Sequence, residues 1–205
     1  RAGLVGEDGP THAGSFDISF LRCIPNLIIM TPSDESETYR ALSTGYDFNG
    51  PAAVRYPRGK GIGKPIDKGM RPLEIGKGLI RRDGNTVAIF AFGSMVKASL
   101  EAADKLGATL VDMRFVKPLD EELIRKLTAN HQLVVTVEES AVMGGAGSAV
   151  NEFLAQTSTP IQTLNLGLPD KFLEHGKPSE MLDEIDLNCE GIIQAIKNKQ
   201  NECGL

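Results

Sequence analysis

Cysteine and histidine are scarce in this sequence, which contains three of each. No two of the cysteines have the CxxC spacing of a metal or redox site, and the histidines are equally scattered. We therefore expect no structural metal site, and the odd number of cysteines favours a reducing compartment. The scattered residues are Cys23, Cys189, Cys203, His12, His131 and His175.

The sequence also lacks an excess of positive charge and any long apolar segment. It has 22 Lys and Arg residues against 27 Asp and Glu residues, which gives a net charge of −5. An acidic total argues against a surface for nucleic acid or for an anionic membrane. No apolar run approaches the roughly 20 residues that cross a bilayer, and no secretory signal is visible. We therefore expect no nucleic-acid partner and no membrane span.

Two common functional patterns are absent or incomplete. Ser94 and Ser148 lack the GxSxG frame of a serine hydrolase. From Gly145 the sequence reads G-A-G-S-A-V, so Val150 replaces the third glycine of a dinucleotide-binding fingerprint. The glycines of residues 144–148 are therefore better explained by close packing of a helix on a strand than by phosphate binding.

Short apolar runs alternate with helical patterns along the chain. The expected strands are residues 27–30, 52–56, 78–82, 86–92, 109–111, 133–137 and 161–164. The expected helices begin near residues 31–35, 93–94 and 120–122 and include Val150, Met181 and Ile192. Strands that alternate with helices predict an α/β fold with right-handed crossovers and a mostly parallel sheet flanked by helices.

The first of these helices has a specific predicted arrangement. Thr31 or Ser33 can cap its amino end, because both hydroxyls can accept a hydrogen bond from a free backbone N–H. Tyr39, Leu42 and Tyr46 then recur at helical spacing and predict its apolar face.

Glycine and proline are concentrated in residues 60–76, where apolar periodicity is lost. We interpret this stretch as a linker between two domains. Residues 1–59 then end one α/β domain, and residues 77–205 form a complete second domain. Asp83-Gly84 predicts a hairpin turn at the start of the second domain.

Residues 6–12, with the sequence GEDGPTH, form the main candidate site. Their glycines and proline predict a tight loop that can direct Asp8 and His12 into one cavity as catalytic groups. Arg1 and Arg58 are candidate substrate ligands, because a guanidinium matches phosphate geometry with parallel donors. Arg55 is a weaker candidate, for which a salt bridge at the strand end is the alternative.

Glu138 and Glu139 follow the strand expected at residues 133–137. Two adjacent carboxylates can act as an acid and a base. No second element of a hydrolase accompanies them, so we favour a helix-capping or interface role.

Several separate motifs carry a family resemblance. They are GEDGPTH followed by AGSFDISFLRCIPN, RYPRG at residues 55–59, DMRFVKPLD at 112–120, VEE at 137–139, MGGAGS at 143–148 and NLGLPD at 165–170. Together they are similar to the thiamine-diphosphate-dependent transketolase superfamily, and within it they resemble the 1-deoxy-D-xylulose-5-phosphate synthases. The match corresponds to the carboxy-terminal third of such an enzyme. The resemblance implies the end of a pyrimidine-binding domain followed by a transketolase C-terminal-like domain.

The resemblance also implies an activity. The family condenses pyruvate with glyceraldehyde 3-phosphate, with loss of carbon dioxide, to make precursors of isoprenoids (terpenoids), thiamine and pyridoxal. Its cofactors are thiamine diphosphate and Mg²⁺, and their main ligands correspond to sequence before Arg1. His12 and Asp8 would line the substrate channel, and Arg1 and Arg58 would bind the substrate phosphate. The implied enzyme is a homodimer of the bacterial cytoplasm or of a plastid stroma, and we expect this chain alone to be inactive.

Three other interpretations remain open. One is a true transketolase, which shares GEDGPTH. Another is a beta-type subunit of a 2-oxoacid dehydrogenase, whose partner chain would supply the diphosphate site. The last is a non-catalytic dimerisation module.

Overall fold

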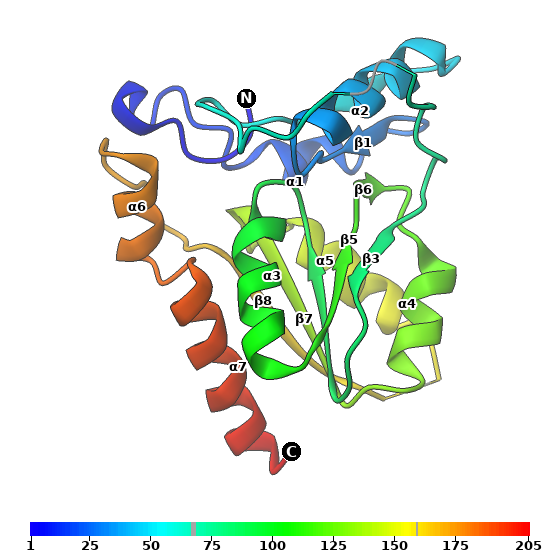
Figure 1. Ribbon diagram of the computed structural model, residues 1–205, viewed down its shortest axis with the longest axis vertical. Helices are drawn as coiled ribbons and strands as arrows, with labels where there is room; N and C mark the ends of the chain where they lie inside the picture. Colours follow the sequence, from blue (N-terminus) through cyan, green and yellow to red (C-terminus); the bar gives the residue numbers. More distant parts are fainter. Residues whose placement is uncertain (67–68, 159) are drawn as a thin grey trace.

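The computed structural model describes residues 1–66, 69–158 and 160–205. It contains a three-stranded sheet in the order β2-β1-β6 and a five-stranded sheet in the order β3-β5-β4-β7-β8 (Figure 1). The strands are β1 (Ile28–Met30), β2 (Ala52–Val54), β3 (Leu79–Arg82), β4 (Val87–Ala91), β5 (Thr109–Asp112), β6 (Phe115–Lys117), β7 (Leu133–Ala141) and β8 (Gln162–Leu168). The predicted α/β fold with a mostly parallel sheet is confirmed.

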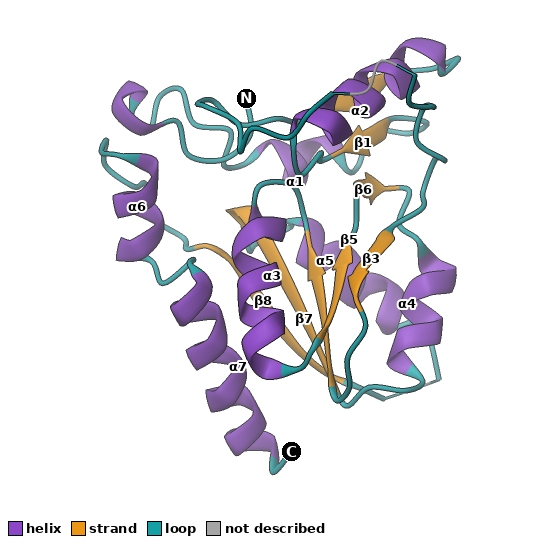
Figure 2. Cartoon of the chain, viewed as in Figure 1, coloured by secondary structure: helices purple, strands orange, loops and turns teal. Residues whose placement is uncertain are grey.

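Helices cover both faces of the larger sheet (Figure 2). They are α1 (Asp17–Leu21), α2 (Glu35–Asp47), α3 (Met95–Leu106), α4 (Glu121–Thr128), α5 (Ala146–Leu154), α6 (Pro178–Glu184) and α7 (Cys189–Cys203), with a short 3₁₀ turn η1 (Gly6–Asp8). None of the helices in the described ranges is long and apolar enough to cross a membrane.

The central strand β4 shows how the sheet is buried on both faces. Val87, Ile89 and Ala91 pack in one core cluster with α3 and α7. Ala88 and Phe90 point the other way, into a cluster with α4 and α5. Successive side chains of a strand alternate between faces, so a continuous apolar run fits a strand that is covered on both sides.

The second core cluster also contains residues from the first part of the chain. Ile18 of α1 and Ile29 of β1 are fully buried in it. In addition, β6 pairs antiparallel with β1, so a strand from beyond residue 77 completes the small sheet. Residues 1–59 therefore lie against the carboxyl ends of β4 and β7 and share their core (Figure 1). Of the predicted linker, residues 67–68 lie outside the described residues.

The prediction for α2 was wrong in two respects. Its cap is Asp34, whose side chain accepts from the Glu37 N–H at 2.8 Å. Its expected apolar face is largely exposed, since Leu42 is 51% and Tyr46 91% accessible. The helix instead buries Glu37, because Arg114 forms a salt bridge with its carboxylate at 2.7 Å.

The predicted hairpin at Asp83-Gly84 is also wrong. Strand β3 pairs antiparallel with β5 and not with the following strand β4. The Gly84 N–H donates to the Thr109 hydroxyl at 3.0 Å, so the turn is fastened to the start of β5. Strand β7 is longer than predicted and includes Glu138 and Glu139.

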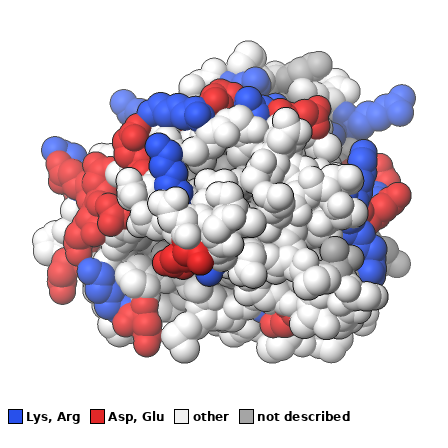
Figure 3. Space-filling model, turned by 90° about the horizontal axis from the view of Figure 1, so that it is seen from below, with Lys and Arg blue, Asp and Glu red and all other residues white. Residues whose placement is uncertain are grey.

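The charged side chains of the lower end of the molecule are mixed in sign. On this face, Lys and Arg alternate with Asp and Glu around a largely uncharged centre (Figure 3). A broad basic surface for a polyanion is therefore absent from the face shown.

Candidate functional site

The GEDGPTH segment forms a closed loop at the carboxyl end of the sheets. The Gly3 N–H donates to the Gly14 carbonyl at 3.0 Å, and the Gly14 N–H donates back at 2.8 Å. The Ala2 N–H donates to the Tyr56 carbonyl at 2.9 Å, which ties the loop to the chain after β2. We call residues 3–14 the substrate loop, after the role that the sequence analysis predicts for Asp8 and His12.

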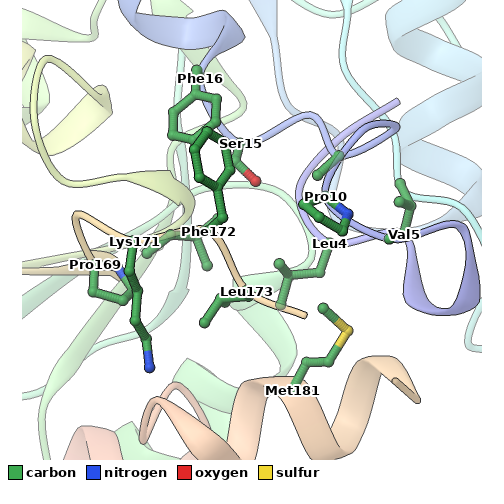
Figure 4. Close-up of a pocket in the computed structure, with 13 residues that line it drawn as sticks. Leu4, Val5, Pro10, Ser15, Phe16, Pro169, Lys171, Phe172, Leu173 and Met181 are labelled. Carbon is green, nitrogen blue, oxygen red and sulfur yellow. The ribbon is translucent and has the colours of Figure 1, made fainter. Parts of the chain in front are cut away.

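Apolar side chains support the substrate loop from behind. Leu4 packs in the same core cluster as Leu173 and Met181. Figure 4 shows these side chains and Pro10 around one small pocket between the loop, α6 and the segment after β8. The loop is thus seated on the core, although its charged side chains reach solvent.

The structure brings together three of the four predicted site residues. One oxygen of Asp8 lies 3.0 Å from Arg1 Nη1 and 3.0 Å from Arg58 Nε. Both arginine side chains are about half exposed, at 50% and 46%. Two positive charges on one carboxylate leave a net charge of about +1, which suits a bound anion.

His12 lies on the same loop but has a different partner. Its Nδ1 atom is 3.0 Å from the Thr11 hydroxyl, and the side chain is exposed. Among the hydrogen bonds of the described residues, none joins His12 to Asp8. The loop therefore places the two predicted catalytic groups in one segment without pairing them.

Arg55 is a buried structural residue. Its Nε lies 3.0 and 2.9 Å from the two carboxylate oxygens of Asp17. Its Nη2 donates to the Glu139 carbonyl at 3.0 Å and also to the Gly14 carbonyl. The alternative of a salt bridge at the strand end is confirmed.

Glu138 caps helix α5. Its two carboxylate oxygens accept the N–H groups of Ala146 and Gly147, each at 2.7 Å. Burial raises the pKa of Glu138 to about 7. The predicted capping role is confirmed, and the carboxylate occupies the helix terminus where a bound phosphate would lie.

The glycines before and within α5 permit close packing, as predicted. A Cβ atom on Gly145 would lie 2.4 Å from a Glu138 carboxylate oxygen. One on Gly147 would lie 2.4 Å from the Thr136 hydroxyl and 2.3 Å from the Asn165 amide. We call residues 142–148 the capped loop.

Glu139 connects the sheet to the substrate loop. Its Oε1 accepts the Leu4 N–H at 2.8 Å, and its Oε2 accepts the Ser94 hydroxyl. Burial raises the pKa of Glu139 above its ordinary value. The predicted interface role is confirmed, although the sequence could not identify the partner, because Leu4 is 135 residues away.

Lys97 is a candidate that the sequence analysis missed. It lines an open groove of about 560 Å³ with Arg58, Lys60 and Tyr56. Nothing in the local pattern of α3 relates Lys97 to the substrate loop, so only the folded structure identifies it.

Within the described residues, no group of three His, Cys, Asp or Glu side chains can hold a metal ion.

Comparison with known families gives two matches. "Transketolase, C-terminal domain" matches residues 76–192, and "Transketolase, pyrimidine binding domain" matches residues 1–62. The 1-deoxy-D-xylulose-5-phosphate synthase of Pseudomonas aeruginosa (strain LESB58) is 60% identical over 97% of this chain and 32% of its own length. That of Pseudomonas fluorescens (strain Pf-5) is 58% identical over 100% of this chain and 32% of its own length. The chain thus spans about a third of these curated relatives.

Two solved structures share the fold. A split-gene transketolase, described as an inactive beta4 tetramer, has a TM-score of 0.83 at 30% identity, over 94% of this chain and 63% of its own. The transketolase of Campylobacter jejuni has a TM-score of 0.68 at 20% identity, over 95% of this chain and 29% of its own. The resemblance drawn from the motifs is confirmed, and this chain belongs to the transketolase family.

Proposed function

We propose that this chain is part of a 1-deoxy-D-xylulose-5-phosphate synthase, which condenses pyruvate with glyceraldehyde 3-phosphate and releases carbon dioxide. The names of the curated relatives support the proposal. The observation that carries it is the cationic cluster of Arg1, Asp8 and Arg58. Two half-exposed guanidinium groups with one shared counter-charge suit a phosphate monoester.

Each group in the substrate loop then has a role. Arg1 and Arg58 bind the phosphate of glyceraldehyde 3-phosphate, and Asp8 fixes the distance between the two guanidinium groups. His12 is exposed nearby on the loop and can transfer a proton to or from a substrate oxygen near neutral pH.

The proposed cofactor is thiamine diphosphate with Mg²⁺, which supplies the electron sink for decarboxylation when bound. The residues of this chain do not fit the diphosphate and metal part of its site. The described part of the chain offers no metal-binding cluster, and the α5 terminus is already filled by Glu138. We therefore propose that residues outside this chain hold these groups. We also propose that the working enzyme is a homodimer of the cytoplasm or a plastid. Its product would feed isoprenoid, thiamine and pyridoxal synthesis.

The proposal is tested in the complete enzyme, meaning a full-length protein that carries this chain. Arg58→Ala should remove one charge-assisted contact to phosphate, which is worth about 1.5–3 kcal/mol. The KM for glyceraldehyde 3-phosphate should then rise by about 10- to 150-fold, with the pyruvate KM almost unchanged. Arg125→Ala is the matched control, because Arg125 is 57% exposed and also paired with an acid.

The results distinguish the proposal from its main alternative. Equal losses for both substrates, or none, would contradict the assignment of Arg58. The main alternative is a true transketolase, because the split-gene transketolase shares 30% sequence identity with this chain. It would use a ketose phosphate as donor instead of pyruvate, so exchanging the donor in the same assay separates the two activities.

A further inference from the structure

The substrate loop is anchored at its base by two side chains from other parts of the fold. On one side, Glu139 of β7 accepts the Leu4 N–H at 2.8 Å. On the other side, the Arg55 guanidinium donates to the Gly14 carbonyl. Arg55 also donates to the Glu139 carbonyl at 3.0 Å, so the two anchors are joined.

The Glu139 carboxylate lies directly against the loop backbone. A Cβ atom on Gly3 would be 2.2 Å from Glu139 Oε1, and Gly3 has a φ of +61°. A side chain at this position would therefore displace the carboxylate and strain the backbone. The second carboxylate oxygen accepts the Ser94 hydroxyl at the start of α3, which fixes the direction of the carboxylate.

A short series of contacts leads from Glu139 to the cationic cluster. Leu4 is bonded to Glu139, and the carbonyl of the next residue, Val5, accepts from Arg58 Nη1 at 3.0 Å. Arg58 Nε in turn pairs with Asp8 at 3.0 Å. A shift of the Leu4–Val5 backbone would therefore move the acceptor that orients Arg58.

We infer that Glu139 is a positioning residue for the phosphate-bearing substrate, acting through Leu4 and Val5 on Arg58. This inference rests on the proposed function, since it requires Arg58 to bind the phosphate. Glu139 is 6% exposed, and both of its carboxylate oxygens are already bonded, one to the Leu4 N–H and the other to the Ser94 hydroxyl.

The test compares Glu139→Ala with Glu139→Gln in the complete enzyme. The alanine leaves the Leu4 N–H without its acceptor. The glutamine keeps an oxygen for Leu4 and presents an amide to Ser94, whose hydroxyl can also accept. Misplacing a ligand group by about 1 Å can cost up to about 100-fold. We expect Glu139→Ala to raise the KM for glyceraldehyde 3-phosphate by roughly 10-fold or more. The pyruvate KM of this variant should stay within about twofold of the original value. Glu139→Gln should restore most of the lost affinity for glyceraldehyde 3-phosphate.

Glu138→Ala is the matched control. Glu138 is adjacent in sequence and equally buried, but its carboxylate binds α5 instead of the loop. It should lower the melting temperature without a selective effect on the phosphate substrate. A similar KM change in Glu138→Ala, or no rescue by Glu139→Gln, would overturn the inference.

A double variant tests the route of the effect. If Glu139 acts through Arg58, then Glu139→Ala combined with Arg58→Ala should raise the KM no further than Arg58→Ala alone. Independent, multiplying effects would overturn the inference. If Arg58→Ala is effective and Glu139→Ala is silent, only the positioning role fails. If Arg58→Ala is itself silent, the proposed function fails and the positioning role fails with it.

Amide hydrogen exchange gives a readout that is independent of turnover. Exchange in the substrate loop should be faster in Glu139→Ala than in the unchanged enzyme, and close to normal in Glu139→Gln. If the alanine variant does not fold, Glu139→Asp replaces it, because its carboxylate is one methylene shorter and withdraws from Leu4. Unchanged exchange in Glu139→Asp, with an unchanged KM, would overturn the inference.

Discussion

The substrate loop and the capped loop are both rich in glycine and both lie at the carboxyl ends of strands, yet they are suited to different tasks. In the capped loop, the Ala146 and Gly147 N–H groups are already bonded to Glu138. In the substrate loop, Arg1 and Arg58 share a single carboxylate and remain about half exposed. Glycine content therefore does not identify a binding loop; what matters is whether its donors already have a partner inside the protein.

This difference predicts opposite consequences of mutation. Changes in the charged side chains and His12 of the substrate loop should alter turnover or substrate affinity and leave folding nearly intact. Changes in the capped loop should alter stability and leave the kinetics of the folded molecules nearly intact. Four measurements test this division.

The largest effect is expected at His12. His12→Ala should lower kcat of the complete enzyme by roughly 10²–10⁴-fold, the usual contribution of a positioned acid–base group. The melting temperature should hardly change, because the side chain is exposed. His12→Gln should recover substrate binding better than turnover, since an amide donates a hydrogen bond but does not exchange a proton. A variant that melts early but turns over normally per folded molecule would make His12 structural.

Next in size is the effect of filling the space at Gly147. Gly147→Ala places a methyl group within 2.4 Å of Thr136 and should destabilise the fold by about 1–3 kcal/mol. Gly176→Ala is the control, since its new methyl would lie 3.4 Å from Met181, an ordinary contact. Thermal unfolding of both variants measures the difference. A loss of turnover at an unchanged melting temperature would contradict the packing role of the capped loop.

A smaller, pH-dependent effect is expected at Glu138. Its pKa of about 7 in the folded state exceeds the ordinary value of 4.5. The folded protein then holds this proton more tightly than the unfolded chain does, so the contribution to stability is greatest below pH 4.5. It is lost as the pH rises through about 7, and amounts to about 3 kcal/mol in total.

Glu138→Gln should remove this part of the pH dependence. Melting temperatures between pH 5 and pH 8 measure it, and the slope should be flatter for the variant than for the unchanged protein. Glu121→Gln is the control, because Glu121 is 61% exposed. If both variants kept the original slope, another group would be responsible.

The smallest expected effect is a difference between the two loops in how their amide exchange responds to phosphate. Inorganic phosphate added to the complete enzyme should slow amide exchange in the substrate loop and leave residues 142–148 unchanged. The reason is that Glu138 already occupies the N–H donors at the start of α5. Protection of the capped loop would show that Glu138 can be displaced and would remove the distinction between the loops.

The sequence predicted the elements that depend on local pattern. The run at residues 86–92 became β4, and Asp120 caps α4 by accepting the Leu123 N–H at 3.1 Å. The sequence did not predict β6, a strand of three residues that forms by pairing with the edge of β1. It also failed for the buried face of α2, because the Glu37–Arg114 ion pair spans 77 residues and has no local signal.

The candidate site was predicted in part for the same reason. The loop chemistry and the family motifs identified Asp8, His12, Arg1 and Arg58 as candidates. Their roles remain predictions, but the structure shows that Asp8 pairs with both arginines and not with His12. The Glu139 contact could not be predicted, since it joins residues 135 positions apart through a backbone N–H that any residue would carry.

The pairing of β6 with β1 has a practical consequence for dissecting this protein. A protease that cuts the connecting segment would leave β6 in the sheet of the preceding part, with Lys117 opposite Ile29 and Phe115 opposite Met30. The two pieces would stay associated after the cut and would separate only on denaturation. Expressed separately, the first piece would lack one strand of its sheet and expose β1 as an open edge, which is an aggregation hazard. Any exchange of parts with another protein therefore has to move β6 together with residues 1–59.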